Sequence, residues 1–137
     1  MYATNATLQQ YVPDIFDHGI TTFETELTRS TTDIQRDLKG KWWSTTGYPA
    51  SSFDATKLVA AEWERATVYH ALAYYILPQL ANFSEADTFL SMMEFYRQRF
   101  TEEFNAVLAA GVSYDFDADG NIDAGESNYQ QSMRLYR

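Results

Sequence analysis

Two long stretches of helical hydrophobic periodicity constrain the fold of this chain most. Apolar side chains that recur at three-, four- and seven-residue steps lie on one face of an α-helix. Residues 54–81 and 85–110 show this spacing most clearly. The second stretch carries the stripe Phe89, Met93, Tyr96, Phe100, Phe104 and Leu108. Alanines in the first allow another helix to approach closely, namely Ala60, Ala66, Ala71 and Ala73.

Residue types that begin and end helices bound these two stretches. Asp54 can cap the first, and Pro78 should bend or end it. Ser84, followed three residues later by Asp87, forms a variant capping box before the second stretch. Gly111 is a good C-terminal stop for that helix.

The N-terminal third predicts further helices. One short helix is expected over residues 5–11, stopped by Pro13. From Asp14 the chain turns helical, and one apolar stripe follows the spacing of an α-helix, formed by Ile20, Phe23, Leu27, Ile34 and Leu38.

Serine and threonine interrupt this N-terminal helical pattern. Their weak helix propensity predicts a kink or break near residues 29–32. Ser30 or Thr32 could cap a second piece that runs to Lys39 and is closed by Gly40. The chain is therefore predicted to be all-α, a helical bundle of three to four main helices with short connections.

A loop separates the N-terminal helices from residues 54–81. The segment "KWWSTTGYPASSFD" contains glycine, proline and many hydroxyl side chains, which are typical of loops. Trp42, Trp43 and Tyr48 are unusual there. We expect them to pack either on the bundle or on a neighbouring subunit.

Composition excludes several classes of function. With 137 residues and 45% hydrophobic side chains, the chain fits one domain with a real core. The net charge is −9, and it would be −4 without the five acids of one C-terminal loop. Nucleic-acid binding through phosphates is disfavoured because it needs clustered Lys and Arg. The absence of cysteine excludes disulfides and thiolate sites.

The sequence also gives no sign of a membrane protein. No segment approaches the roughly 20 apolar residues needed to cross a bilayer. The first residues, "MYATNATLQQYVPD", lack the basic start and apolar run of a signal peptide. We therefore expect the protein to be made and folded in the cytosol.

The motif "DFDADGNIDAGE", residues 115–126, carries the clearest chemical signal. Calcium takes six to eight oxygen ligands on a loop with one sharp turn. Gly120 suits that turn, Asn121 would contribute its backbone carbonyl, and Glu126 would bind with both oxygens. The predicted ligands are Asp115, Asp117, Asp119, Asn121, Asp123 and Glu126. The alternative is a solvated acidic turn, but five carboxylates so close together repel one another unless a cation neutralises them.

A calcium loop can serve a sensor or a structural clamp. Sensor loops usually occur in pairs and join two helices that swing open. One such loop is present here, its entering helix should stop at Gly111, and a short polar helix is expected over residues 124–136. This arrangement favours a clamp. We expect a bundle domain over residues 1–111 and a loop with a C-terminal interaction segment over residues 112–137.

The remaining groups of residues give no support for an enzyme. His70 lies on an apolar helix, where a hydrogen-bonded core histidine is the more common role. No phosphate-binding glycine loop, zinc-protease helix or serine elbow is present. The stretch "MMEFYRQRF", residues 92–100, is interpreted first as core and second as a subunit interface.

Three stretches together resemble a known family. They are "TTDIQRDLKGKWW", "LVAAEWERATVYHALAYYILPQL" and "FLSMMEFYRQRFTEEFNAVLAAGVSYDFDADGNI". Their order is similar to that of the small helical head–tail connector proteins of tailed bacteriophages, also called adaptor or head-completion proteins. The resemblance covers roughly residues 20–126, and its motifs are largely compositional.

The resemblance implies a structural role in the virion and no catalytic residues. Connectors of this kind dock under the portal as a homo-oligomeric ring, usually matching the dodecameric portal. They extend the channel through which genomic DNA passes, without specific binding, and they present a platform for tail-side neck proteins. The implied location is the neck of the virion. The alternative function is a calcium-binding regulatory protein of the EF-hand type.

Overall fold

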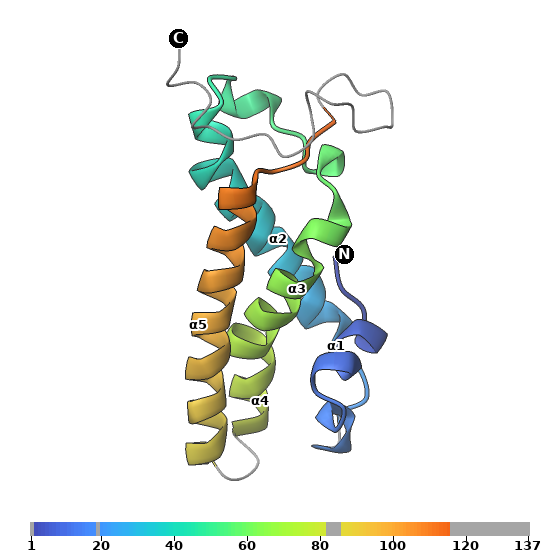
Figure 1. The fold of residues 1–137 in the computed structure, drawn as a ribbon. Helices are drawn as coiled ribbons and strands as arrows, with labels where there is room; N and C mark the ends of the chain where they lie inside the picture. Colours follow the sequence, from blue (N-terminus) through green and yellow to red (C-terminus); the bar gives the residue numbers. More distant parts are fainter. Residues whose placement is uncertain (1, 19, 82–85, 116–137) are drawn as a thin grey trace.

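The computed structural model describes residues 2–18, 20–81 and 86–115 (Figure 1). Over these residues the fold is all-α, as predicted, and contains no strand elements. The α-helices are α1 (Asn5–Tyr11), α2 (Glu24–Lys41), α3 (Ala60–Ala71), α4 (Leu77–Ala81) and α5 (Ala86–Ala110). Short 3₁₀ turns span Ile15–His18, Trp43–Thr45, Ala50–Ser52 and Ala55–Lys57, and a π-helical turn spans Leu72–Ile76. The predicted capping box at Ser84 and the helix over residues 124–136 lie outside the described residues.

The helices form an elongated bundle. Helix α5 runs antiparallel to α3 and α4 and packs along both, while α2 crosses α3 on the other side (Figure 1). Helix α1 lies beside α3 near the middle of the bundle. The end of α5, the end of α2 and the loop after α2 therefore gather at one end of the molecule, which we call the loop end.

Two clusters of buried side chains fill the bundle. The cluster nearer α1 and α4 includes Leu8, Phe23, Leu27, Leu72, Ile76 and Leu80. The cluster at the loop end includes Ile34, Leu38, Trp42, Trp43, Trp63, Phe104, Val112 and Tyr114. Trp42 and Trp43 thus pack on the bundle, one of the two predicted alternatives. Tyr48 remains 51% exposed.

Helix α5 confirms the predicted apolar stripe where its side chains are described. Phe100 and Phe104 are buried, and Met93, Tyr96 and Leu108 pack against the core while partly exposed. The helix ends as predicted, because Gly111 has a φ of 100°, a conformation that glycine adopts without strain.

The predicted break near residues 29–32 is wrong, because α2 is continuous. Hydroxyl groups in this stretch find partners without leaving the helix. Thr31 and Thr32 donate to the carbonyls four residues earlier, at 3.0 and 3.2 Å. Ser30 is fully buried and is hydrogen-bonded to His70. Tertiary packing thus overrides weak local propensity, and Gly40 lies inside the helix instead of closing it.

The α-helical start predicted at Asp14 is also wrong, since α2 begins at Glu24. A 3₁₀ turn, Ile15–His18, and a linker without regular structure, residues 20–23, occupy the intervening described residues. The side chain of Asn5 secures this linker, accepting from the Phe23 backbone N–H at 3.0 Å and donating to Thr22 at 3.0 Å. Hydrogen bonds between segments far apart in the sequence produce no periodic pattern, so the periodicity of the sequence does not predict them.

The helix predicted over residues 54–81 begins later, at Ala60, and runs to Ala81 as three consecutive pieces, namely α3, the π-helical turn and α4. Asp54 caps the 3₁₀ turn Ala55–Lys57. Near the other end, the π-helical turn closes with the Leu77 N–H donating to the Leu72 carbonyl. Pro78 is the second residue of α4, where the missing proline N–H costs least. The predicted disturbance at Pro78 is therefore a widened turn just before it.

Over residues 2–18, 20–81 and 86–115, no helix combines the length and the apolar character needed to cross a bilayer.

Helix α5 offers one core-facing and one solvent-facing phenylalanine, Phe104 and Phe95, for a matched test of the packing. Phe104 is 2% exposed and packs on Trp63 with ring centroids 5.6 Å apart, whereas Phe95 is 52% exposed. We expect Phe104→Ala to lower the free energy of unfolding by about 3–5 kcal/mol, because it leaves a cavity. Phe95→Ala should cost about 1 kcal/mol or less. Urea denaturation measures both, and equal losses would contradict the described orientation of α5.

Candidate functional site

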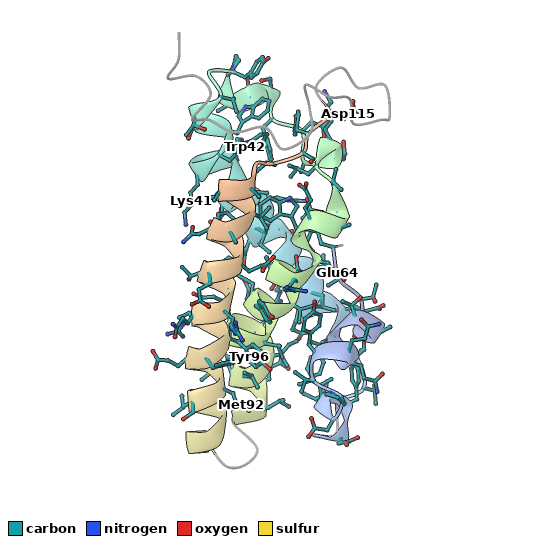
Figure 2. The ribbon with its side chains drawn as sticks, in the orientation of Figure 1. Lys41, Trp42, Glu64, Met92, Tyr96 and Asp115 are labelled. Atoms are coloured by element: carbon teal, nitrogen blue, oxygen red, sulfur yellow. The ribbon has the colours of Figure 1, made fainter. Side chains whose placement is uncertain are left out.

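Of the six predicted metal ligands, Asp115 is the one that the structure describes. The other five, Asp117, Asp119, Asn121, Asp123 and Glu126, lie outside the described residues. Asp115 stands at the loop end, near the end of α2 that carries Trp42 (Figure 2). In the described part of the chain, no group of three or more His, Asp or Glu side chains is placed to hold a metal ion.

The segment that leads to Asp115, residues 112–115, is docked into the bundle. Val112 and Tyr114 are buried, with exposed fractions of 0% and 1%. Tyr114 forms an isolated antiparallel β-bridge with Leu58, and the Asp115 N–H donates to the Lys57 carbonyl at 3.0 Å. Residues 112–115 are therefore fixed on the bundle. We call residues 112–115 the docked segment.

The carboxylate of Glu62 holds the docked segment from α3. The Ser113 backbone N–H donates to one carboxylate oxygen of Glu62 at 3.1 Å. The Ser113 hydroxyl donates to the other oxygen at 2.7 Å. Bonds to an ionised acceptor are stronger than neutral ones, and two parallel bonds also fix orientation. No sequence motif predicts this pair, because its members are 51 residues apart.

Aromatic rings hold the side chain of Tyr114. Its ring lies 5.0 Å from that of Trp43 and 5.6 Å from that of Trp42, between centroids. The Tyr114 hydroxyl accepts from the Asp54 backbone N–H at 3.1 Å. Tyr114 therefore joins the docked segment both to the end of α2 and to the start of the 3₁₀ turn Ala55–Lys57.

Two carboxylates act on the Tyr114 hydroxyl at the loop end. Hydrogen bonds from the Thr56 hydroxyl (2.6 Å) and the Thr56 N–H (3.0 Å) hold the pKa of Asp54 below its usual value. Burial raises the pKa of the Tyr114 hydroxyl, and the charges of Asp54 and Asp115 add to the rise. The Tyr114 hydroxyl therefore stays protonated and can also donate a hydrogen bond.

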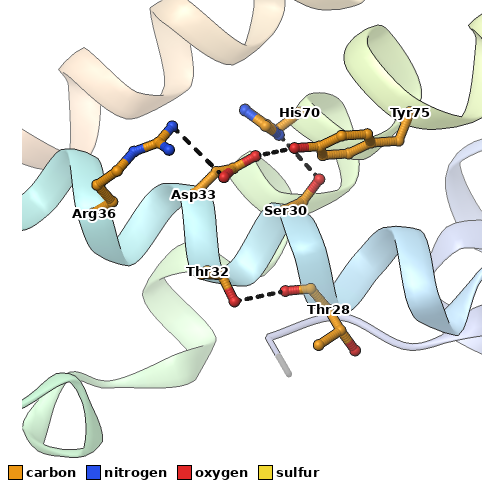
Figure 3. Close-up of polar contacts among 7 residues, drawn as sticks. All are labelled: Thr28, Ser30, Thr32, Asp33, Arg36, His70 and Tyr75. Atoms are coloured by element: carbon orange, nitrogen blue, oxygen red, sulfur yellow. Dashed lines mark hydrogen bonds and ion pairs between the residues drawn. The ribbon is translucent and has the colours of Figure 1, made fainter.

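A second polar cluster lies where α2 crosses α3 (Figure 3). Ser30 Oγ and His70 Nδ1 are 2.9 Å apart, and the Tyr75 hydroxyl donates to Asp33. Asp33 also pairs with Arg36 at 3.6 Å. This cluster joins α2 to α3 and to the π-helical turn. Because Ser30 is 0% exposed, its hydroxyl cannot meet a substrate in this conformation.

His70 is the hydrogen-bonded core histidine that was predicted. It is 7% exposed and lies 4.6 Å from the Tyr74 ring and 4.8 Å from the Phe100 ring, between centroids. Burial lowers the pKa of His70, although the charges of Asp33 and Asp37 oppose this shift. The folded protein therefore favours the neutral imidazole.

Comparisons with known proteins identified no relative of this chain. No protein-family model, curated protein or solved structure matches the chain.

The Glu62–Ser113 contact leads to a stability prediction. Ser113→Ala removes the hydroxyl bond to Glu62 while keeping the backbone bond. We expect a loss of about 1–2 kcal/mol in the free energy of unfolding, measured by urea denaturation. Ser91→Ala, at an exposed position of α5, is the matched control and should change stability by less than about 0.5 kcal/mol. If both variants unfold alike, Glu62 does not hold the docked segment.

The lowered pKa of His70 leads to a prediction about pH. The unfolded chain binds the proton more tightly than the folded protein, so stability is fully present above about pH 6.5, the ordinary histidine pKa. It is lost as the pH falls from there toward the folded pKa. We expect the urea midpoint to decline below that pH, and His70→Gln to reduce the decline. His18→Gln, which replaces the only other histidine, should retain it; the reverse result would contradict the assignment.

Proposed function

We propose that this chain is a structural protein of a tailed-phage neck, a head–tail connector that forms a homo-oligomeric ring under the portal. The ring extends the DNA channel and presents a platform for tail-side neck proteins. Its copy number is proposed to match the dodecameric portal, as in the family that the sequence resembles. DNA passes through the channel without specific binding, in keeping with the net charge of −9.

The observation that carries the proposal is the docked segment. A ring protein must present its contact segments in fixed positions, because closure of the ring tolerates little angular error. Residues 112–115 are anchored by Lys57, Glu62 and the aromatic rings around Tyr114. The residues that follow Asp115 thus leave the bundle from a fixed point, as suits an assembly contact.

Calcium has a structural role in this proposal. Bound to the loop of residues 115–126, it acts as a clamp that sets the direction of the C-terminal segment. Asp115, the first proposed ligand, has its backbone N–H tied to Lys57. A ligand held in place before the ion arrives loses less conformational entropy when it binds.

The alternative, a calcium-binding regulator, needs an entering helix that moves when the ion binds. Helix α5 ends at Ala110, and residues 111–114 separate it from Asp115. Movement at the loop would therefore have to break the bonds to Glu62 and Lys57 before it reached the helix. This separation favours the clamp.

Calcium addition tests the clamp. We expect calcium to raise the melting temperature, because a ligand that binds only the folded state stabilises it, by about 2.7 kcal/mol at one hundred times Kd. Asp115→Ala combined with Glu126→Ala should abolish the rise. Glu94→Ala combined with Glu102→Ala removes the same charge from exposed positions of α5 and should keep it. A large calcium-dependent increase in apolar dye binding would favour the regulator instead.

Assembly with the portal tests the connector. The full-length chain should bind rings of the portal protein encoded in the same genome, which electron microscopy of the mixture would show. Particles that lack the chain should accumulate as filled heads and separate tails. Normal tail joining in such particles, together with no binding to the portal, would overturn the proposal.

A further inference from the structure

The loop after α2, residues 44–53, is held rigidly although it contains no regular helix longer than one turn. Trp43 Nε1 donates to the Pro49 carbonyl at 2.9 Å, which closes the loop across its base. The Thr46 hydroxyl donates to the Trp43 carbonyl at 2.7 Å. The Ser52 hydroxyl and N–H both donate to the same Pro49 carbonyl, at 2.7 and 3.1 Å. Gly47, with a φ of 90°, makes the sharp turn. We call these residues the aromatic loop.

Tyr48 is the most prominent side chain of the aromatic loop. One face of its ring stacks on Trp43, with centroids 5.4 Å apart and an interplanar angle of 22°. Trp43 is itself buried, with 2% exposed, whereas Tyr48 is 51% exposed. The ring is thus oriented by the core while much of its surface faces solvent. A large side chain that is already ordered loses little entropy on binding, and tyrosine is enriched among residues that dominate interface energies.

The aromatic loop is also uncharged. No Lys, Arg, Asp or Glu occurs between Lys41 and Asp54, in a chain whose net charge is −9. Its exposed positions are Ser44, Gly47, Tyr48, Pro49, Ala50, Ser51 and Ser52. Small hydroxyl-bearing and glycine residues around a tyrosine suit a contact surface that adapts its hydrogen bonds to a partner.

We propose that the aromatic loop binds a second copy of this chain, with Tyr48 as the anchoring side chain. Two copies of an acidic protein repel each other, and the repulsion is smallest where the contact surface carries no charge. A partner selected by opposite charge would instead meet charged side chains here. The proposal rests on the ring of the proposed function, because it names the surface through which neighbouring copies meet.

The geometry of a ring adds a constraint on this contact. In a closed ring each copy uses two different surfaces, one toward each neighbour. The aromatic loop is one of them and must meet a different surface of the next copy. Photo-crosslinking from position 48 identifies that receiving surface directly.

Self-association of the full chain tests the anchor. We expect Tyr48→Ser to raise the dissociation constant between copies at least about tenfold, measured by sedimentation equilibrium. Tyr48→Phe should change it little, because the ring is kept. Phe95→Ser, which alters an aromatic of similar exposure (52%) on α5, should leave it unchanged. Melting temperatures of all three variants show whether the fold is intact.

A photoreactive benzoylphenylalanine at position 48 provides the second measurement. Covalent dimers and higher oligomers of the chain support the proposal. A chain that stays monomeric at all concentrations, or oligomers that form equally well with Tyr48→Ser and give no crosslink, would overturn it. Oligomers that form without Tyr48 would overturn only this contact and would leave the proposed connector function standing. Conversely, Tyr48-dependent oligomers that bind no portal would refute the connector and leave this contact in place.

Discussion

The packing of Tyr114 among Trp42, Trp43 and Phe53 is the interaction on which the loop end depends. The ring of Tyr114 stacks on that of Phe53 at 21°, with centroids 6.3 Å apart, and its hydroxyl caps the Asp54 N–H. Three segments far apart in the sequence thereby share one core: the end of α2, the turn before α3 and the segment after α5. Without this core, neither the aromatic loop nor the start of the acidic loop would have a fixed position.

This arrangement places the features with functional potential at one end of the bundle. Trp43 contacts Tyr114 on its buried side and Tyr48 on the side toward the aromatic loop. Trp43 therefore links Tyr48 directly to the docked segment. The opposite half of the bundle, around Leu72 and Ile76, is closed by apolar packing and by the His70 cluster at the crossing of α2 and α3. The bundle thus acts as a rigid support, and its loop end carries the proposed contacts.

The sequence predicted what local patterns determine. The helix over α1, the apolar stripe of α5 and its stop at Gly111 all follow from periodicity and from glycine's conformational freedom. The predicted break in α2 was wrong, because buried hydroxyl bonds outweighed weak propensity. The helix predicted from residue 54 begins only at Ala60, because a 3₁₀ turn and a β-bridge at Leu58 occupy its expected start. In the candidate site, the ligand spacing predicts a role for Asp115 that stays a prediction, whereas the Glu62–Ser113 pair joins distant segments and leaves no motif.

Charge connects the two proposals. A chain with a net charge of −9 resists self-association, because its copies carry charge of the same sign. The aromatic loop shares the loop end with Asp54 and with Asp115, the first residue of the acidic loop. A divalent cation bound to residues 115–126 would neutralise charge at the end where copies are proposed to meet. Calcium would then do more than orient the C-terminal segment: it would also lower the electrostatic cost of placing one loop end beside another, so the clamp and the Tyr48 contact would strengthen each other.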